Sequence, residues 1–351
     1  MKNKIEKLKN KFESDNFLWT NQKETFYLSN AGFDGFWLVF LGEKVHAICS
    51  KMIENQVRDY FKNDNAVQIS TVDKSFIDTL CKILKENNDN KIIVDLRYIN
   101  GEIFVQLSEK LAKENIKLIA KSSILDDLRI IKSAYEIDNI RKACDIVSEI
   151  ADMIKRELKI GMSELDIHYR VLELFAQKHV SASFTPIVAA GANSANPHHQ
   201  SSNYKIKDYD PILMDIGCYY NGYSSDLTRT YYLDKIANKI NEILKIVRAA
   251  HSAVISGIKA GLDISWADKT ARQIIENNGY KDKFIHAAGH GIGIEVHETP
   301  SLNSKAEGVF LCPMTAAIEP GIYLDGQFGV RIEDTILITK TGCEVLTSAQ
   351  Y

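Results

Sequence analysis

The C-terminal part of the chain contains one series of elements twice, and this repeat limits the possible folds more than any other feature. Residues 133–232 predict a helix, a break at Gly161, a second helix and then strands that end in a hairpin. Residues 236–345 predict the same series with the break at Gly261. Apolar residues at helical spacing, followed by short alternating runs, support both assignments. Two such halves closing on each other would place their hairpins face to face.

The first predicted hairpin, residues 211–230, carries two aspartates. Apolar residues alternate with small or polar ones on either side of Asn221-Gly222, which is a strong signal for a tight turn. With the turn centred on this pair, Asp215 and Asp226 are diagonal neighbours about 7 Å apart. With the turn centred between Tyr220 and Asn221, they face each other directly at about 5 Å. Either register brings both carboxylates to one site.

The second predicted hairpin and a glycine-flanked histidine supply the other candidate ligands. Glu319 and Glu333 are equidistant from Gly326, which lies in a glycine-rich turn. His290 has a glycine on each side, so the backbone can approach closely and leave room beside the imidazole. Four carboxylates and one imidazole predict a site for two divalent cations, with Mn²⁺ preferred and Co²⁺, Fe²⁺ or Zn²⁺ as alternatives.

Six short runs lie in a fixed order in this part of the chain. They are AspIleGly, SerAspLeuThrArgThr, GlyHisGlyIleGly, ValHisGluThrPro, IleGluProGly and GlyValArgIleGluAsp. Each run alone has an ordinary explanation as a turn or an exposed strand, but their combination is specific. Together they resemble the pita-bread metallopeptidase family, which includes methionine aminopeptidase, aminopeptidase P and prolidase. The resemblance implies a pita-bread catalytic domain.

The resemblance also assigns roles to the candidate ligands. It implies that Asp226 and Glu333 bridge two metal ions. Asp215 would complete the ligand set of the first ion, and His290 with Glu319 would complete that of the second. Two such ions lower the pKa of a shared water and polarise the scissile carbonyl. Glu319 is then the candidate to relay the proton from the attacking water to the leaving nitrogen.

Two further histidines match family positions. His297, in ValHisGluThrPro, would donate a hydrogen bond to the oxyanion. His198, in AlaAsnProHisHis, would contact the substrate on the opposite wall. The adjacent His199 is the alternative if the match shifts by one residue, and a solvated turn is the ordinary explanation for such a pair.

Two other residues have more than one interpretation. His286 lies four residues before His290 and resembles a substrate-pocket histidine of aminopeptidase P, but a buried structural histidine fits equally well. Arg331 would pair with Asp215 or line the substrate pocket, because arginine binds carboxylates through a rigid fork of donors. Its charge would otherwise simply balance the acidic cluster.

Residues 1–128 predict a separate α/β domain, and residues 129–351 predict the pita-bread catalytic domain of α+β class. The boundary is expected between residues 125 and 132. Strands are expected at 36–42, 44–49, 66–70, 91–95 and 116–120, and helices near 74–88 and 102–115. This first domain resembles the N-terminal domain of creatinase, aminopeptidase P and prolidase, including the run TyrLeuSerAsnAlaGlyPheAspGly at 27–35.

The resemblance narrows the activity further. Methionine aminopeptidases generally lack such an N-terminal domain, so we expect an Xaa-Pro aminopeptidase, with Xaa-Pro dipeptidase (prolidase) as the alternative. Several microbial prolidases have an arginine directly after the HisGlu-x-Pro run, suited to a dipeptide carboxylate, whereas this chain has Ser301. The family implies a homodimer that acts on short proline-containing peptides. A non-catalytic peptide-binding protein is the alternative from another class.

Composition excludes several other classes. A net charge of −3 without a clustered basic face gives no basis for nucleic-acid binding. No stretch approaches about 18 consecutive apolar residues, and the N-terminus has no apolar signal-peptide core, so no membrane association is expected. The six cysteines show no CxxC spacing, which argues against a disulfide framework and a zinc knuckle. A cytoplasmic protein is therefore expected.

Overall fold

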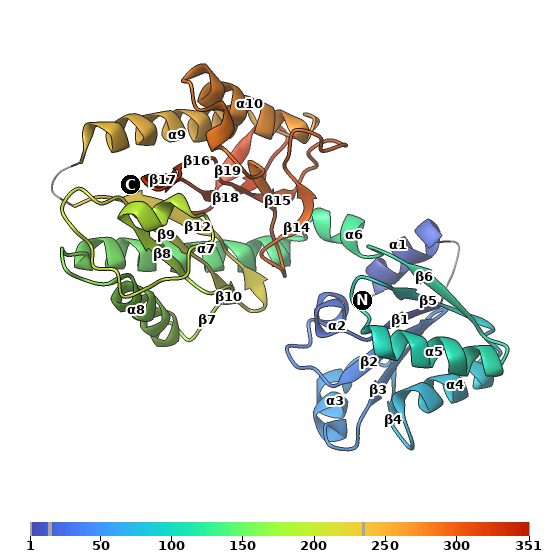
Figure 1. Cartoon of the computed structure of the whole chain (residues 1–351). Coiled ribbons are helices and arrows are strands. Elements are labelled where there is room, and N and C mark those ends of the chain that lie inside the picture. The colour runs from blue at the N-terminus through green and yellow to red at the C-terminus, as the bar shows by residue number, and fades with distance from the viewer. Residues whose placement is uncertain (1, 13–15, 234–235, 351) are drawn as a thin grey trace. The chain divides into compact units, whose positions relative to one another are not determined.

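The computed structural model describes residues 2–12, 16–233 and 236–350, and its contacts divide the chain into two compact units (Figure 1). The first unit is Met1–Leu128 and the second is Arg129–Tyr351. Each unit has its own sheets and its own buried apolar core, so the two are described in turn. None of the described helices is long and apolar enough to cross a membrane.

The first unit is built on a six-stranded mixed sheet in the order β4-β3-β2-β1-β5-β6. Its strands are β1 (Asn16–Trp19), β2 (Phe36–Leu41), β3 (Lys44–Cys49), β4 (Val67–Thr71), β5 (Lys91–Asp95) and β6 (Lys117–Lys121). Its helices are α1 (Lys2–Phe12), α2 (Gln22–Ser29), α3 (Glu54–Phe61), α4 (Phe76–Glu86) and α5 (Gly101–Lys113), and α6 (Asp126–Ile130) leads into the second unit. The strands and helices expected here are confirmed, and their ends differ by no more than two residues.

Strand β1 is absent from the prediction, although it lies in the middle of this sheet. It pairs antiparallel with β2, where Phe17 lies opposite Phe40, and parallel with β5, where Phe17 lies opposite Ile93. All four residues of β1 are buried. A run this short shows no alternating pattern, so its place in the sheet depends on pairing with distant segments.

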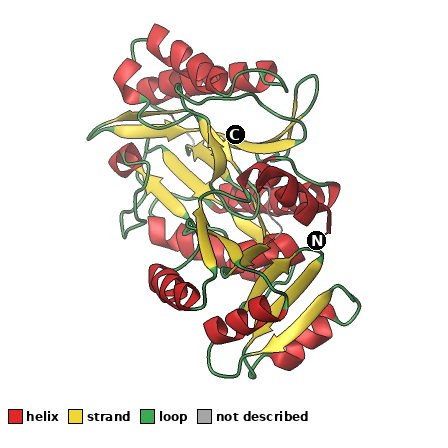
Figure 2. Ribbon diagram, turned by 90° about the vertical axis from the view of Figure 1, so that its right-hand side faces the viewer, coloured by secondary structure: helices red, strands yellow, loops and turns green. Residues whose placement is uncertain are grey.

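The second unit contains the predicted repeat. Its first half comprises α7 (Ala134–Glu157), α8 (Glu164–Gln177), β7 (Ser181–Ala182), β8 (Ile187–Ala190), a 3₁₀ turn (Gly191–Ala195), β9 (Ile212–Ile216), β10 (Cys218–Tyr220), β11 (Tyr223–Ser224) and β12 (Leu227–Tyr231). Its second half comprises α9 (Asn238–Gly257), α10 (Ser265–Asn277), a 3₁₀ turn (Lys281–Lys283), β13 (Gly289–Gly291), β14 (Glu298–Ser301), β15 (Met314–Ile318), β16 (Gly321–Leu324), β17 (Phe328–Arg331), β18 (Asp334–Ile338) and β19 (Cys343–Val345). The two helix pairs lie on the outside and the strands lie between them (Figures 1 and 2).

Local sequence explains the breaks in both helix pairs. Gly161 and Gly261 have φ values of +86° and +88°, a conformation that other residues rarely adopt. In the first half, Ser163 begins α8 through a capping box with Asp166, which satisfies backbone N–H groups that the helix start leaves free. The second half has no such side-chain cap at the start of α10, so tertiary packing contributes more to where that helix begins.

The two hairpins differ in their turns, and the structure selects one of the two predicted registers for the first. Asn221 and Gly222 both have positive φ and form the two-residue turn between β10 and β11. Asp215 therefore pairs with Thr228, and Asp226 is its diagonal neighbour. In the second hairpin, the pairing of Gly321 with Arg331 and of Ile318 with Asp334 has a single register, in which Glu319 lies opposite Glu333.

Candidate metal centre

Four carboxylates converge from the two hairpins. Asp215 lies in β9, and Asp226 directly precedes β12. Glu319 directly follows β15, and Glu333 directly precedes β18. Asp215, Asp226 and Glu333 are at most 9% exposed. Each half of the second unit therefore contributes two acids, and most of their surface is removed from water.

His290 lies among these carboxylates. Its Nε2 atom is 3.6 Å from Asp226 Oδ2 and 3.7 Å from Glu319 Oε1. One possible ligand atom from each of Asp226, His290 and Glu333 lies within 4.8 Å of the others. Ligand atoms from both halves are thus gathered closely enough to form a candidate metal centre.

Burial and mutual repulsion raise the pKa values of these carboxyl groups. Burial, followed by the charges of Glu333 and Asp215, raises the pKa of Asp226 well above its ordinary value. Burial, followed by the charges of Glu319 and Asp215, does the same for Glu333. Burial raises the pKa of Glu319 to about 7. Buried acids held this close favour a bound cation, which would compensate their charge.

The donor atoms also suit a divalent cation. Burial, followed by the charge of His297, lowers the pKa of His290 to about 4, so its imidazole is neutral at pH 7. His290 Nδ1 donates to Gly291 O at 3.1 Å, which leaves the lone pair on Nε2 directed toward the carboxylates. Among the described residues, the buried Oδ1 atoms of Asp215 and Asp226 have no hydrogen-bond partner. These free lone pairs are the kind that metal coordination satisfies.

Arg331 connects the two hairpins beside the cluster. Its Nη2 donates to Asp215 Oδ2 at 2.6 Å, its Nε to Thr228 Oγ1 at 3.1 Å and its Nη1 to Tyr323 OH at 2.9 Å. The Thr228 hydroxyl donates in turn to Glu333 Oε2 at 2.7 Å. Of the interpretations predicted for Arg331, the structure shows the pairing with Asp215. Arg331 is 3% exposed, and these contacts hold its guanidinium between the two hairpins.

His297 and His286 lie next to the cluster. The ring centroids of His297 and His290 are 4.2 Å apart, and burial lowers the pKa of His297. His286 Nδ1 is 3.9 Å from Glu319 Oε2 and donates to a backbone carbonyl, while its Nε2 accepts from Tyr323 OH at 2.9 Å. Burial lowers the pKa of His286 to about 4. Neutral imidazoles therefore line one side of the carboxylate cluster.

The structure distinguishes His198 from His199. His199 Nε2 is 2.8 Å from Glu164 Oε2, a fully buried carboxylate that also accepts hydrogen bonds from other groups of the same loop. His198 is exposed, and a charge on it would lower the pKa values of both His286 and His297. His199 is thus held by Glu164, whereas the side chain of His198 stays exposed.

Three residues that shape this centre are absent from the predicted set: Thr228, Tyr323 and Glu164. Thr228 lies inside the run SerAspLeuThrArgThr, and Tyr323 lies just after IleGluProGly, so their closeness to predicted ligands was an available signal. Glu164 is the first residue of α8. Acidic residues are common at the start of a helix, so the local sequence does not indicate that Glu164 binds a loop distant in the chain.

Comparison with known protein families gives two matches that together cover most of the chain. Residues 138–340 match the model of metallopeptidase family M24. Residues 2–131 match the model of the creatinase/prolidase N-terminal domain. The chain is 37% identical over 275 residues to an Xaa-Pro dipeptidase of Pyrococcus furiosus, which covers 78% of this chain and 77% of the relative. It is 33% identical over 334 residues to a putative Xaa-Pro aminopeptidase of Mycoplasma genitalium, which covers 93% and 91%.

Solved structures show the same two kinds of relative. The structure of an Xaa-Pro dipeptidase from Bacillus anthracis matches with a TM-score of 0.95 and 31% identity, covering 99% of this chain and 98% of that one. The structure of an X-Pro aminopeptidase from Thermotoga maritima matches with a TM-score of 0.90 and 26% identity, covering 98% of both chains. The similarity therefore extends over both units.

Proposed function

Because the chain belongs to metallopeptidase family M24 and carries a creatinase/prolidase N-terminal domain, we propose that this metallo-exopeptidase is an Xaa-Pro aminopeptidase. It would release the residue before proline from short peptides. The observation that carries this choice is the place of Ser301. In the pairing of β13 with β14, Ser301 lies opposite His290, so the two side chains share a face of the sheet.

A small neutral side chain at this position offers no cation to the free carboxylate of a dipeptide. The Ser301 hydroxyl accepts a hydrogen bond from Asn303 Nδ2 at 3.2 Å. Arg331 is the cation that the structure does place at the cluster, but it is buried and bound to Asp215. A longer peptide, whose carboxylate lies beyond the proline, needs no such partner at the cluster.

Xaa-Pro dipeptidase is the second candidate, and a specific observation favours it. The relatives from Pyrococcus furiosus and Bacillus anthracis, to which this chain is 37% and 31% identical, are both named Xaa-Pro dipeptidases. In that case the group that binds the dipeptide carboxylate would lie elsewhere than position 301.

We propose that two divalent cations are held by the four carboxylates and His290. When bound, they supply Lewis-acid polarisation of the scissile carbonyl and of the attacking water. Mn²⁺ is preferred because the donor set is rich in oxygen, with Co²⁺, Fe²⁺ or Zn²⁺ as alternatives. Asp226 and Glu333 would each hold both ions, as the family resemblance implies, and one possible ligand atom of each lies within 4.8 Å of the other and of His290.

Side chains around this centre would move the proton and stabilise the reacting groups. Glu319 is proposed to accept the proton of the attacking water and deliver it to the leaving nitrogen, because its carboxyl group lies beside His290 among the candidate ligands. Neutral His297 would donate its N–H to the oxyanion. Exposed His198 and half-buried His286 would contact the peptide. Arg331 would act through Asp215 instead of touching the substrate.

The deciding experiment compares three peptides on the Mn²⁺-supplemented protein, with products identified by mass spectrometry. The peptides are an Xaa-Pro-Xaa tripeptide, an Xaa-Pro dipeptide with the same first residue, and an Xaa-Ala control. We expect the tripeptide to be cleaved fastest and the control not at all. Faster dipeptide cleavage would make the protein a prolidase. If the metal-loaded protein cleaves none of the three peptides, the remaining interpretation is a non-catalytic peptide-binding protein.

Variants at Ser301 test the observation on which the choice depends. Ser301→Arg should move the preference toward the dipeptide, because the guanidinium would supply the missing partner for its carboxylate. Ser301→Ala is the matched control and should keep the wild-type ratio of tripeptide to dipeptide cleavage rates. If this ratio is the same in both variants, position 301 does not contact the substrate.

We also propose that the protein works in the cytoplasm as a homodimer on short proline-containing peptides. All six cysteines are free and dispersed, which suits a reducing compartment. Sedimentation of the full-length protein would test the dimer, and a single species at the monomer mass would contradict it.

A further inference from the structure

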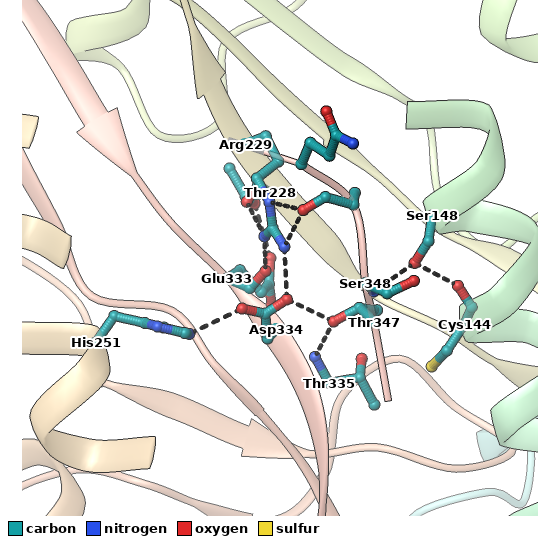
Figure 3. A network of polar contacts seen from close by, with 12 residues as sticks. Cys144, Ser148, Thr228, Arg229, His251, Glu333, Asp334, Thr335, Thr347 and Ser348 are labelled. Carbon is teal, nitrogen blue, oxygen red and sulfur yellow. Dashed lines mark hydrogen bonds and ion pairs between the residues drawn. The ribbon is translucent and has the colours of Figure 1, made fainter. Parts of the chain in front are cut away.

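A buried ion pair lies behind the candidate metal centre, on the faces of β12 and β18 that point away from it (Figure 3). Arg229 follows Thr228 in β12, and Asp334 follows Glu333 at the start of β18. Because successive side chains of a strand point to opposite faces, Arg229 and Asp334 cannot reach the cluster that Glu333 enters. Both are only 2% exposed, and their Nη2 and Oδ1 atoms are 2.8 Å apart.

Arg229 binds the main chain at and beside the candidate ligand Glu333. Its Nη1 donates to Glu333 O at 2.6 Å and to Thr228 O at 3.1 Å. Its Nε and Nη2 both donate to Ala349 O, at 3.1 and 3.0 Å. The backbone N–H of Glu333 also donates to Thr228 O at 3.1 Å. One guanidinium therefore fixes the backbone of a second-half ligand against a first-half strand.

Asp334 fixes the orientation of that guanidinium. Besides Arg229, its carboxylate accepts from the Thr347 hydroxyl at 2.6 Å and lies 3.2 Å from His251 Nε2 (Figure 3). The neighbouring Thr335 donates its hydroxyl to Asp226 O at 2.8 Å. The pair and its neighbours thus hold the backbone at both Asp226 and Glu333, one ligand from each half.

These backbone contacts matter because electrostatic repulsion within the cluster opposes the close approach of its carboxylates. Its carboxylates repel one another across the boundary between the halves, yet their oxygens must stay close enough to share cations. The Arg229–Asp334 pair has no net charge, so it positions the strands without adding a net charge beside the cluster. Removing one partner of a buried pair leaves an uncompensated charge, which is far more damaging than the small stability that such a pair contributes.

We propose that Arg229 and Asp334 are positioning residues, which set the cation affinity of the centre by holding the main chain of Glu333 against β12. This inference rests on the metal centre of the proposed function, but not on its peptide specificity. Partners that orient metal ligands typically change metal affinity by about 10- to 100-fold when removed. A loss in that range is the expected effect.

The test measures metal binding by folded protein, not turnover. Metal-free wild type, Asp334→Asn and Arg229→Met are titrated with Mn²⁺ in competition with a chelating dye, well below their unfolding temperatures. The visible absorption of the Co²⁺-loaded proteins is recorded in parallel. We expect about 10- to 100-fold weaker binding and an altered Co²⁺ spectrum in both variants. The double variant should lose little more, because the two side chains act as one unit.

Ser148→Ala is the matched control, because the Ser148 hydroxyl accepts from Ser348 N at 2.9 Å in the same network but touches neither partner of the pair. It should bind Mn²⁺ as wild type does. If Asp334→Asn does not fold, Thr347→Val removes one hydrogen bond to the same carboxylate, together with the acceptor of the Thr335 N–H, and should weaken binding in the same direction.

The outcomes separate this inference from the proposed function. Variants that unfold at lower temperature but keep wild-type affinity and a wild-type Co²⁺ spectrum would show that the pair is only structural. Wild type that binds no cation would overturn the metal centre itself, and the positioning role with it. Weaker binding in the variants supports the positioning role whichever peptide the enzyme cleaves.

Discussion

The two halves of the second unit share a scaffold but not their chemistry. In the first half, β8 lies beside β9, and its residues 187–190 read Ile-Val-Ala-Ala. In the second half, β13 occupies the equivalent place beside β15 and reads Gly-His-Gly. Ile187 pairs with the ligand Asp215, whereas His290 pairs with Ala317. A strand that fills the core at the sheet edge in one half therefore corresponds to a strand that carries the imidazole between β14 and β15 in the other.

Glycine makes this exchange possible. A Cβ atom on Gly289 would lie 1.9 Å from Ala317 O, and one on Gly291 would lie 2.5 Å from Thr299 O. Strand β13 therefore approaches both neighbours more closely than any side chain would allow. The difference teaches that a duplicated scaffold gains its candidate histidine ligand by modifying the strand beside one hairpin, while both halves keep the same order of helices, strands and acid-bearing hairpin.

The largest effect on turnover should come from replacing Glu319, the proposed proton carrier of the second half. Glu319→Gln should lower kcat by about 10²- to 10⁴-fold, because an amide cannot accept the proton of the attacking water. The unfolding temperature of the metal-free protein should change little below about pH 4, where the Glu319 carboxyl is protonated in both states. Steady-state kinetics and thermal unfolding check this, with exposed Glu307→Gln as the control. Retained turnover would remove the proposed role of Glu319.

The histidines of the two halves should respond differently. His297→Ala, in the second half, should lower kcat by about 10²- to 10³-fold, because a donor to the transition state is lost. His198→Ala, in the first half, should chiefly raise KM, because its exposed side chain contacts the bound peptide. Kinetics at several peptide concentrations separate kcat from KM. The same change in kcat and KM in both variants would contradict the proposal that His297 acts in the transition state and His198 in peptide binding.

A change on strand β13 should affect stability before chemistry. Gly289→Ala should destabilise the protein by about 1–3 kcal/mol, because its Cβ atom would overlap a backbone oxygen and force β13 away from β15. Gly342→Ala is the control, because nothing lies within 4 Å of the added atom. Denaturant unfolding of both metal-free variants measures the difference. Equal midpoints would mean that the close approach of β13 is not required.

The smallest effect concerns repulsion between the halves in the metal-free protein. The folded-state pKa values of Asp226, Glu333 and Glu319 are raised, to about 7 for Glu319. Above the unfolded value of about 4, the folded state therefore binds more protons, and stability is lost as pH rises toward 7. Denaturant unfolding with chelator at several pH values should show this slope, and Glu319→Gln should flatten it. An unchanged slope in that variant would assign the pH dependence to other groups.

Sequence alone determined the features that depend on neighbouring residues. A turn near Asn221-Gly222, the glycine breaks at 161 and 261, and the strands of the first unit other than β1 follow from backbone preference and short-range periodicity. Tertiary structure decided what depends on segments distant in the chain. Only the fold shows β1 in the middle of its sheet, because a four-residue run has too little pattern of its own.

The same division runs through the candidate site. The sequence identified the four carboxylates and His290, because each lies in a short run whose residue types carry the signal. It left open whether Arg331 lines the pocket and whether His198 or His199 faces the cluster. The fold adds the pairing of Arg331 with Asp215 and the contact of His199 with Glu164, neither of which the sequence pattern specifies. Partners that meet only when distant strands and helices pack leave no local pattern, so hydrogen-bond geometry across the fold had to decide them.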